Sequence, residues 1–325
     1  VAARIVPMAH ANDGGGSTRV PAHCSGLVGL KTTRGRVSTA PNIGESIAGL
    51  GGEFAVTRSV RDAAALLDAV EGPELGEPYE IARPRRPYSE DILEAPRPLK
   101  IACASKAWID VPTDPDVVAA FERTRDLLVD LGHEVSEDLP DFEVETFEGI
   151  VTTIWEAGLA MLVRSISGLT GRLPGPDTLE TLTLSYYEAG KKLPAADYLE
   201  ALIKMNHICR QTAPFFAKYD VLLTPTAAMP APRIGIYNTN RPGGWDPREW
   251  QDLKYKFVPF TALFNVTGQP AISLPLEQSS DDLPIGMQFV SRFGDEATLF
   301  QLAAQLEEAR PWRTRKPSIC EDFEL

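Results

Sequence analysis

A single serine follows three consecutive glycines near the start of the sequence, in the stretch DGGGSTR at residues 13–19. Glycine loses more backbone freedom on folding than any other residue, so three in a row are costly to order. We consider three interpretations of this stretch: a flexible turn, a loop that binds phosphate, and a site for acyl transfer.

The residue types favour acyl transfer. A phosphate loop would end in a Lys-Ser/Thr pair or show GxGxxG spacing after a predicted strand, and neither pattern is present. Acyl transfer needs backbone N–H groups that point at the developing oxyanion. The stretch therefore predicts Ser17 as the nucleophile and Gly14, Gly15 and Gly16 as the oxyanion hole. Asp13 and Arg19 flank these residues, and we expect them to form an ion pair that supports the site.

Other reactive side chains lie close to this stretch in the sequence. His10 and His23 are within seven residues of Ser17, but neither has an acidic partner at a predictable position. We expect a structural role for Lys31 and no activated thiolate at Cys24.

Composition narrows the classes of protein. The 325 residues are 43% hydrophobic and 24% charged, and 32 Lys+Arg against 45 Asp+Glu give a net charge of −13. This acidity argues against a nucleic-acid partner. No run approaches the ~20 apolar residues of a membrane span, so we expect no membrane association. Four scattered cysteines indicate reduced thiols and a cytoplasmic location, and the histidine and cysteine spacing predicts no metal site. We expect no cofactor.

Strands and helices alternate along the predicted elements. The patterns predict helices at 59–72, 114–132 and 295–309, and a helix at 197–219 that is kinked or broken near Pro214. They predict strands at 99–105, 133–140, 220–226, 269–276 and 284–291. The expected fold class is α/β, with a mixed sheet whose two faces are covered by helices.

Residues 71–98 form a separate feature because they contain six prolines and few apolar residues. An interdomain linker is one interpretation. We favour a surface excursion within a single domain that spans residues 1–325.

The glycine-rich stretch and several later blocks resemble one known family. "AHANDGGGSTRVPAHCSGLVGLKTTRGRVS" is similar to the core motif of the amidase signature family, although Thr32 stands where the family has proline. "FAVTRSVRDAAALLD", "YDVLLTPT", "FNVTGQPAISLP" and "LPIGMQFVS" resemble further family blocks in the same order. The resemblance implies the amidase signature fold.

The resemblance also implies a mechanism. Family members hydrolyse amides with a Ser–Ser–Lys triad, in which Ser17 matches the nucleophile. The relay serine and the lysine belong to family blocks that would precede Val1, so we expect this chain to be the C-terminal portion of an amidase. We expect an extended protein, and not these 325 residues alone, to hydrolyse a simple aryl amide.

The expected substrate is a small amide. Residues 146–216 resemble the family least, and their aromatic and methionine side chains predict an apolar or aromatic acyl group; these are Trp155, Met161, Tyr186, Tyr187 and Met205. A weaker likeness is to enzymes that open cyclic nylon-oligomer amides. The alternatives are the A subunit of a glutamine-dependent tRNA amidotransferase and an inactive fragment. A homodimer is left open.

Overall fold

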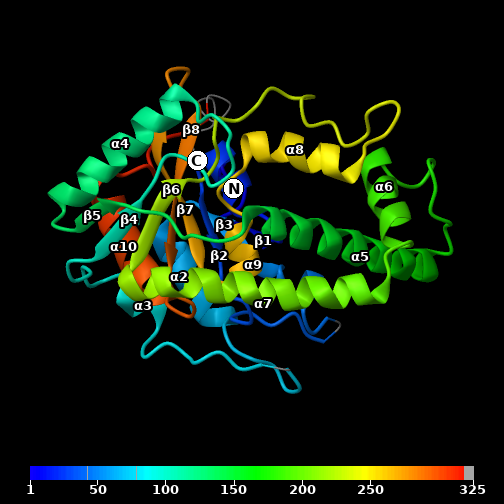
Figure 1. The fold of residues 1–325 in the computed structure, drawn as a ribbon. Coiled ribbons are helices and arrows are strands. Elements are labelled where there is room, and N and C mark those ends of the chain that lie inside the picture. Colours follow the sequence, from blue (N-terminus) through cyan, green and yellow to red (C-terminus); the bar gives the residue numbers. More distant parts are fainter. Residues whose placement is uncertain (42, 78, 318–325) are drawn as a thin grey trace.

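A computed structural model describes residues 1–41, 43–77 and 79–317 (Figure 1). The strands in this part of the chain are β1 (Met8–Asp13), β2 (Val28–Lys31), β3 (Gly52–Thr57), β4 (Lys100–Cys103), β5 (Glu134–Glu137), β6 (Val221–Pro225), β7 (Ala271–Gln278) and β8 (Pro284–Ser291). The helices are α1 (Arg19–Ser25), α2 (Val60–Val70), α3 (Tyr88–Asp91), α4 (Pro115–Asp130), α5 (Val144–Thr170), α6 (Thr181–Gly190), α7 (Ala195–Lys218), α8 (Pro247–Phe257), α9 (Leu263–Thr267) and α10 (Glu296–Ala309), with a 3-10 turn η1 (Ser46–Gly49).

The strands form one mixed sheet in the order β1-β3-β2-β7-β8-β6-β4-β5. β4 runs parallel to both β5 and β6. The other neighbours are antiparallel. The predicted mixed α/β sheet is therefore confirmed.

Along the central strands, apolar side chains point alternately to the two faces of the sheet, which explains why helices cover both faces. On β4, Ile101 packs with α2, α3, α4 and α10, whereas its neighbour Ala102 packs with α5, α7 and α9. Leu223 and Leu222 on β6 divide between the two faces in the same way. Successive side chains of a strand point to opposite faces, and here both sets are apolar.

Local signals placed most helix starts correctly. The Ser59 side chain accepts a hydrogen bond from the Asp62 amide at the start of α2. Asp114 caps α4, with Pro115 at its first position. Of the two predicted outcomes at Pro214, the break is wrong, because α7 continues through this residue, and the kink stays a prediction. Ile208 and Phe216 are buried on either side of Pro214, and this packing offsets the hydrogen bond that proline cannot make.

The proline-rich residues 71–98 lead from α2 to β4 and contain one short helix, α3. The Asp68 carboxylate accepts hydrogen bonds from the Tyr88 and Ser89 amides at 2.6 and 2.9 Å, which fixes the start of α3. β3 and β4, on either side of this segment, belong to the same sheet. The single-domain interpretation stays a prediction.

One helix corrects the view that no apolar segment is long enough to span a membrane. α5 satisfies that criterion by length and composition, with a mean hydropathy of 1.3 in its most apolar window. Phe147, Ile150 and Ile154 of α5 are buried in the core, and 28% of its most apolar window is buried. In Figure 1, α5, α7 and α8 extend beside the sheet, and α6 lies near their far end.

Candidate active site

Ser17 lies in the short connection between the end of β1 and the start of α1. Its side chain is exposed, whereas the flanking residues Gly16 and Thr18 are buried. Among the residues that the structure describes, none forms a hydrogen bond with Ser17 Oγ. We call residues 13–19 the glycine loop.

The Asp13 carboxylate holds the glycine loop together from within. Its Oδ1 accepts hydrogen bonds from the Gly16 amide at 2.6 Å and from Arg19 Nη2 at 2.9 Å. Its Oδ2 accepts from Arg19 Nε at 2.9 Å and from the Thr18 amide at 3.2 Å. Burial alone would raise the pKa of Asp13, but the Arg19 charge and the hydrogen bonds from Arg19 and Asn265 hold it well below its usual range. The carboxylate is therefore ionised at every ordinary pH.

Arg19 joins the glycine loop to distant parts of the chain. Arg19 Nη1 donates to the Thr261 carbonyl at 2.9 Å and to Gln288 Oε1 at 2.7 Å, and Nη2 donates to Asn265 Oδ1 at 2.7 Å. The side chains of Asp13 and Arg19 are 1% and 0% exposed. The predicted ion pair is thus confirmed as a contact, and its support of a catalytic site stays a prediction.

The three glycines have different surroundings. A Cβ on Gly16 would lie 2.5 Å from Thr261 Oγ1, and Gly16 has a φ of +133°, which disfavours any other residue. A Cβ on Gly14 would lie 3.0 Å from Ile47 Cδ1 and from Trp155 Cζ2. A Cβ on Gly15 would meet nothing within 4 Å.

One detail of the predicted oxyanion hole needs revision. The Gly16 amide already donates to Asp13, so it is engaged within the fold. In the described part of the chain, no acceptor is bonded to the amides of Gly14, Gly15 and Ser17. These three remain as candidate donors, and the contribution of Gly16 is its backbone conformation and its small size.

Ser17 opens onto a cavity of about 620 Å³, which we call the serine cavity. Gly15 and Gly16 also line it, and most of its wall is apolar or aromatic. The wall comes from α1, α5, α6, α8 and the loop before α8, through Val20, Pro21, Cys24, Trp155, Leu159, Leu182, Thr183, Tyr186, Ala231, Pro232, Tyr237, Trp250, Gln251, Lys254, Phe257 and Val258.

The aromatic and methionine side chains singled out in the sequence separate into two groups. Trp155 and Tyr186 line the serine cavity. Met161 and Met205 line a different cavity of about 1010 Å³. Tyr187 is among the lining residues of neither. Of the five side chains that were expected to contact the acyl group, only Trp155 of α5 and Tyr186 of α6 therefore line the same cavity as Ser17.

The alternative bases and nucleophiles have other roles. His23 is buried, its Nδ1 accepts from the Gly286 amide at 2.8 Å, and its Nε2 lies 3.1 Å from the Met229 carbonyl. Burial lowers the pKa of His23 to about 4, so the ring is neutral and both nitrogens are engaged.

Lys31, Cys24 and His10 are also unsuited to activating Ser17. Lys31 Nζ donates to the Thr32 carbonyl at 2.9 Å, and burial followed by the Arg19 charge lowers the pKa of Lys31 to about 7, but Lys31 does not line the serine cavity. Burial raises the pKa of Cys24 to about 11, which keeps the thiol protonated. His10 is exposed and pairs with Glu53.

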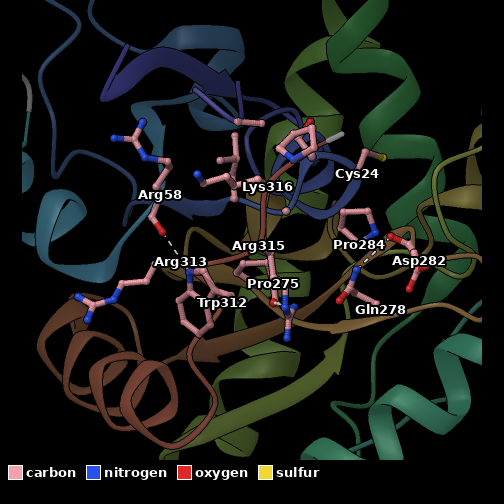
Figure 2. A pocket seen from close by; sticks show the side chains of 15 residues that line it. Cys24, Arg58, Pro275, Gln278, Asp282, Pro284, Trp312, Arg313, Arg315 and Lys316 are labelled. Atoms are coloured by element: carbon pink, nitrogen blue, oxygen red, sulfur yellow. Dashed lines mark hydrogen bonds between the residues drawn. The ribbon is translucent and has the colours of Figure 1, made fainter. Parts of the chain in front are cut away.

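A further cavity, of about 320 Å³, shares Cys24 with the serine cavity (Figure 2). Two of its four basic side chains, those of Arg58 and Arg315, form hydrogen bonds within the fold. Arg315 donates to the Pro275 and Leu276 carbonyls, and Arg58 donates to the Val6 carbonyl. Trp312 Nε1 donates to the Arg58 carbonyl at 3.0 Å. None of the predicted site residues lines this cavity.

No sequence pattern predicted Asn265, Gln251 or Lys254 as residues of the site. Asn265 Nδ2 donates to the Asp13 carbonyl at 2.7 Å and to the Leu50 carbonyl at 2.9 Å, so it anchors the start of the glycine loop. It falls within "FNVTGQPAISLP", a block noted for its resemblance, and that was the available signal. Nothing local in the sequence marks Gln251 or Lys254. Among the described residues no cluster of three or more potential metal ligands occurs.

The chain is similar in sequence and in fold to several known proteins. The AmiC protein of Mycobacterium leprae (strain TN) is 39% identical over 320 residues, which cover 96% of this chain and 64% of that protein. The 6-aminohexanoate-cyclic-dimer hydrolase of Paenarthrobacter ureafaciens is 34% identical, with 98% of this chain and 66% of that protein covered. A solved structure of 6-aminohexanoate cyclic dimer hydrolase superposes with a TM-score of 0.92 at 34% identity, covering 98% of this chain and 68% of that chain.

The chain thus spans about two thirds of the length of the curated relatives that it matches. The family model named Amidase matches residues 1–300. With this match, the sheet order and the ordered glycine loop in place, the chain belongs to the amidase family.

Proposed function

We propose that the complete gene product that carries this chain hydrolyses the C–N bond of small carboxylic amides, with Ser17 as the nucleophile. One observation carries the proposal: Ser17 is exposed at an apolar cavity, within a glycine loop that a buried ion pair fixes in place. The proposal concerns the complete gene product because this chain spans about two thirds of the length of the curated relatives that it matches.

The proposed reaction has two stages. Ser17 Oγ attacks the amide carbonyl and gives its proton to the relay serine and the lysine that the resemblance implies. The amides of Gly14, Gly15 and Ser17 hold the resulting oxyanion. The C–N bond then breaks, the amine leaves with that proton, and an ester remains on Ser17. Water cleaves the ester, which releases the acid and restores the serine hydroxyl.

The apolar wall of the serine cavity is suited to binding the acyl part of the substrate. Trp155, Leu182, Tyr186, Trp250 and Phe257 offer apolar surface and no charge. Burying an acyl chain against such surface contributes about 25 cal/mol per Å². The 6-aminohexanoate-cyclic-dimer hydrolases have a name that implies runs of methylene groups between amides, which suits the same kind of cavity.

The test is hydrolysis of a para-nitroanilide with a medium-length acyl chain. Ser17→Ala should reduce kcat on the order of 10⁶-fold, as loss of the nucleophile does in serine hydrolases. A fluorophosphonate should add its mass to the peptide that contains Ser17. Ser25→Ala is the matched control, because Ser25 is also exposed, at the end of α1, and does not line the serine cavity. Undiminished turnover in Ser17→Ala would refute the proposal.

A further inference from the structure

Two polar side chains interrupt the apolar wall of the serine cavity. Gln251 and Lys254 both lie on α8, and both line the cavity together with Ser17. They are three positions apart, so they occupy the same face of the helix. Neither has a part in the proposed chemistry.

Gln251 offers a hydrogen-bond donor to the cavity. The residue is 5% exposed, and its Oε1 is closed off from solvent without a partner among the described residues. The other polar atom, Nε2, is bonded to no acceptor in the described part of the chain and keeps accessible surface. The accessible polar end of this side chain is therefore the Nε2 amide, which only donates.

Lys254 adds a positive charge without a counter-ion. In the described part of the chain, no carboxylate forms a salt bridge with Nζ, and its charge faces the Tyr255 ring, with the ring centroid 5.1 Å away. Burial lowers the pKa of Lys254 to about 8, so the side chain is still an ammonium group at pH 7. Folding has thus already removed much of the water around this charge without providing an anion in its place.

Two donors on one face of α8, one of them charged, match an ionised carboxyl group. A carboxylate carries the opposite charge and accepts hydrogen bonds on both oxygens. A neutral carbonyl group would leave the ammonium charge uncompensated, and a plain alkyl chain would satisfy neither donor. We propose that Gln251 and Lys254 form a specificity subsite for a carboxylate at the far end of the acyl group, so that the preferred substrates are monoamides of dicarboxylic acids. This inference rests on the proposed function, because it places the acyl group in the serine cavity.

The rest of the cavity suits such a substrate. Trp155, Leu182 and Phe257 provide apolar surface for the methylene groups between the cleaved amide and the carboxylate. The same apolar surroundings strengthen the attraction between the carboxylate and Lys254, because few water molecules screen it. Only the carboxylate still has to lose its water on binding, since Lys254 is desolvated in the folded protein.

The experiment compares mono-para-nitroanilides of dicarboxylic acids with their methyl esters, using the complete gene product at pH 7. Each acid and its ester have the same acyl length, and a series of lengths finds the best fit. We expect KM for the best acid to lie at least about tenfold below KM for its ester, as one charge-assisted hydrogen bond allows. Lys254→Met should bring this ratio to about one, and Gln251→Met should reduce it.

Control variants separate this role from general damage. Lys256→Met removes an exposed lysine of the same helix outside the cavity and should leave the ratio unchanged. Lys254→Arg keeps the charge and should retain much of the preference for the acid. Gln251→Glu supplies a carboxylate at almost unchanged size and should remove that preference. A cooperative thermal transition in each variant, measured by circular dichroism, confirms folding.

Three results would overturn the inference. Equal KM values for acid and ester at every length in the native protein would remove the subsite. A preference for the acid that survives in Lys254→Met would place the carboxylate elsewhere. An equal fall in kcat for acid and ester in Lys254→Met would assign the lysine to the chemistry instead.

Binding distinguishes failure of this inference from failure of the proposed function. If no anilide is hydrolysed, Ser17→Ala protein is titrated with a dicarboxylic monoamide and with its methyl ester. Trp155 and Trp250 line the cavity and provide the fluorescence signal. Tighter binding of the acid that Lys254→Met abolishes supports the subsite without any turnover. Equal binding of the two, or binding of neither, refutes it.

Proton uptake gives a second readout that a merely structural role of Lys254 would not change. A carboxylate beside Nζ raises the pKa of Lys254 above its value of about 8 in the free protein, so binding at pH 8 should take up a fraction of a proton. Calorimetric titration of Ser17→Ala protein in buffers of different ionisation enthalpy measures this uptake. It should be absent for the methyl ester and in Lys254→Met, and equal uptake for acid and ester would contradict the subsite.

Discussion

The charged pair of the glycine loop, Asp13 and Arg19, and the buried Gln251 of α8 differ in how completely their polar atoms are hydrogen-bonded. In the loop, each oxygen of Asp13 accepts hydrogen bonds, and the terminal nitrogens of Arg19 donate to groups on distant elements. On α8, Gln251 Oε1 is buried without a partner. The two charged side chains of the loop are thus bonded inside the protein, although Thr18 Oγ1 in the same loop has no partner among the described residues. The difference indicates that the Asp13–Arg19 network fixes the position of Ser17, whereas Gln251 on α8 is held by no such network among the described residues.

The largest expected effect comes from removing the charge at the centre of the loop. Arg19→Met leaves the buried Asp13 carboxylate without its counter-ion, and we expect the free energy of unfolding to fall by about 3–5 kcal/mol. Urea denaturation measures this loss. Arg125→Met provides the control, because it removes an exposed ion pair with Asp126 and should cost at most about 1 kcal/mol. Equal losses in both variants would show that the loop is no more dependent on its charges than the surface is.

The next effect is a pH dependence that involves α1, which holds the loop from its C-terminal side. Burial lowers the pKa of His23 to about 4, so the folded protein stays unprotonated there while the unfolded chain takes up a proton below about 6.5. The stabilisation is complete above about pH 6.5 and is lost as the pH falls toward 4, a change of about 3 kcal/mol.

His23→Gln removes this titration. We expect its free energy of unfolding to fall less steeply than that of the native protein between these pH values, as measured by urea denaturation at a series of pH values. Parallel curves for the two proteins would contradict the assignment. Above about pH 8 the native ring is neutral in both states, and any remaining difference there reports lost packing and hydrogen bonds.

Two glycine substitutions in the loop should have different effects, one on stability and the other on substrate binding. Gly16→Ala should cost about 2 kcal/mol or more, because Gly16 has a φ of +133° and a Cβ would lie 2.5 Å from Thr261 Oγ1. Gly15→Ala meets nothing within 4 Å and should leave the thermal transition almost unchanged. Its effect should appear in substrate binding, because Gly15 lines the serine cavity. A greater loss of stability for Gly15→Ala than for Gly16→Ala would reverse this picture of the loop.

The smallest effect is expected at the cavity wall. Leu182→Ala shortens a side chain of α6 that lines the cavity, and KM for a long-chain anilide should rise about tenfold relative to KM for an acetanilide. Steady-state kinetics measures the ratio. Leu199→Ala removes an exposed leucine of α7 outside the cavity and should not change it.

Local sequence was sufficient for features that depend on neighbouring residues. Ser59 and Asp114 predict the starts of their helices correctly, because a capping side chain accepts a hydrogen bond from an amide within the next few residues. The break considered at Pro214 is absent for the converse reason: the packing that keeps α7 continuous comes from other elements, which helix propensity does not include. The proline-rich residues 71–98 were interpreted as a surface excursion within one domain, and the strands on either side of them, β3 and β4, belong to the same sheet.

By itself the sequence determined the glycine loop, with Asp13 and Arg19 placed to pair and Ser17 between a strand and a helix, because a seven-residue stretch contains all of these groups. Only the tertiary structure decided what surrounds them. Asn265 and Gln288 reach Arg19 across 246 and 269 positions of the chain, and Gln251 and Lys254 face the same cavity as Ser17. Such contacts depend on how the sheet and its helices pack, and no spacing along the chain encodes that packing in a form that can be read locally.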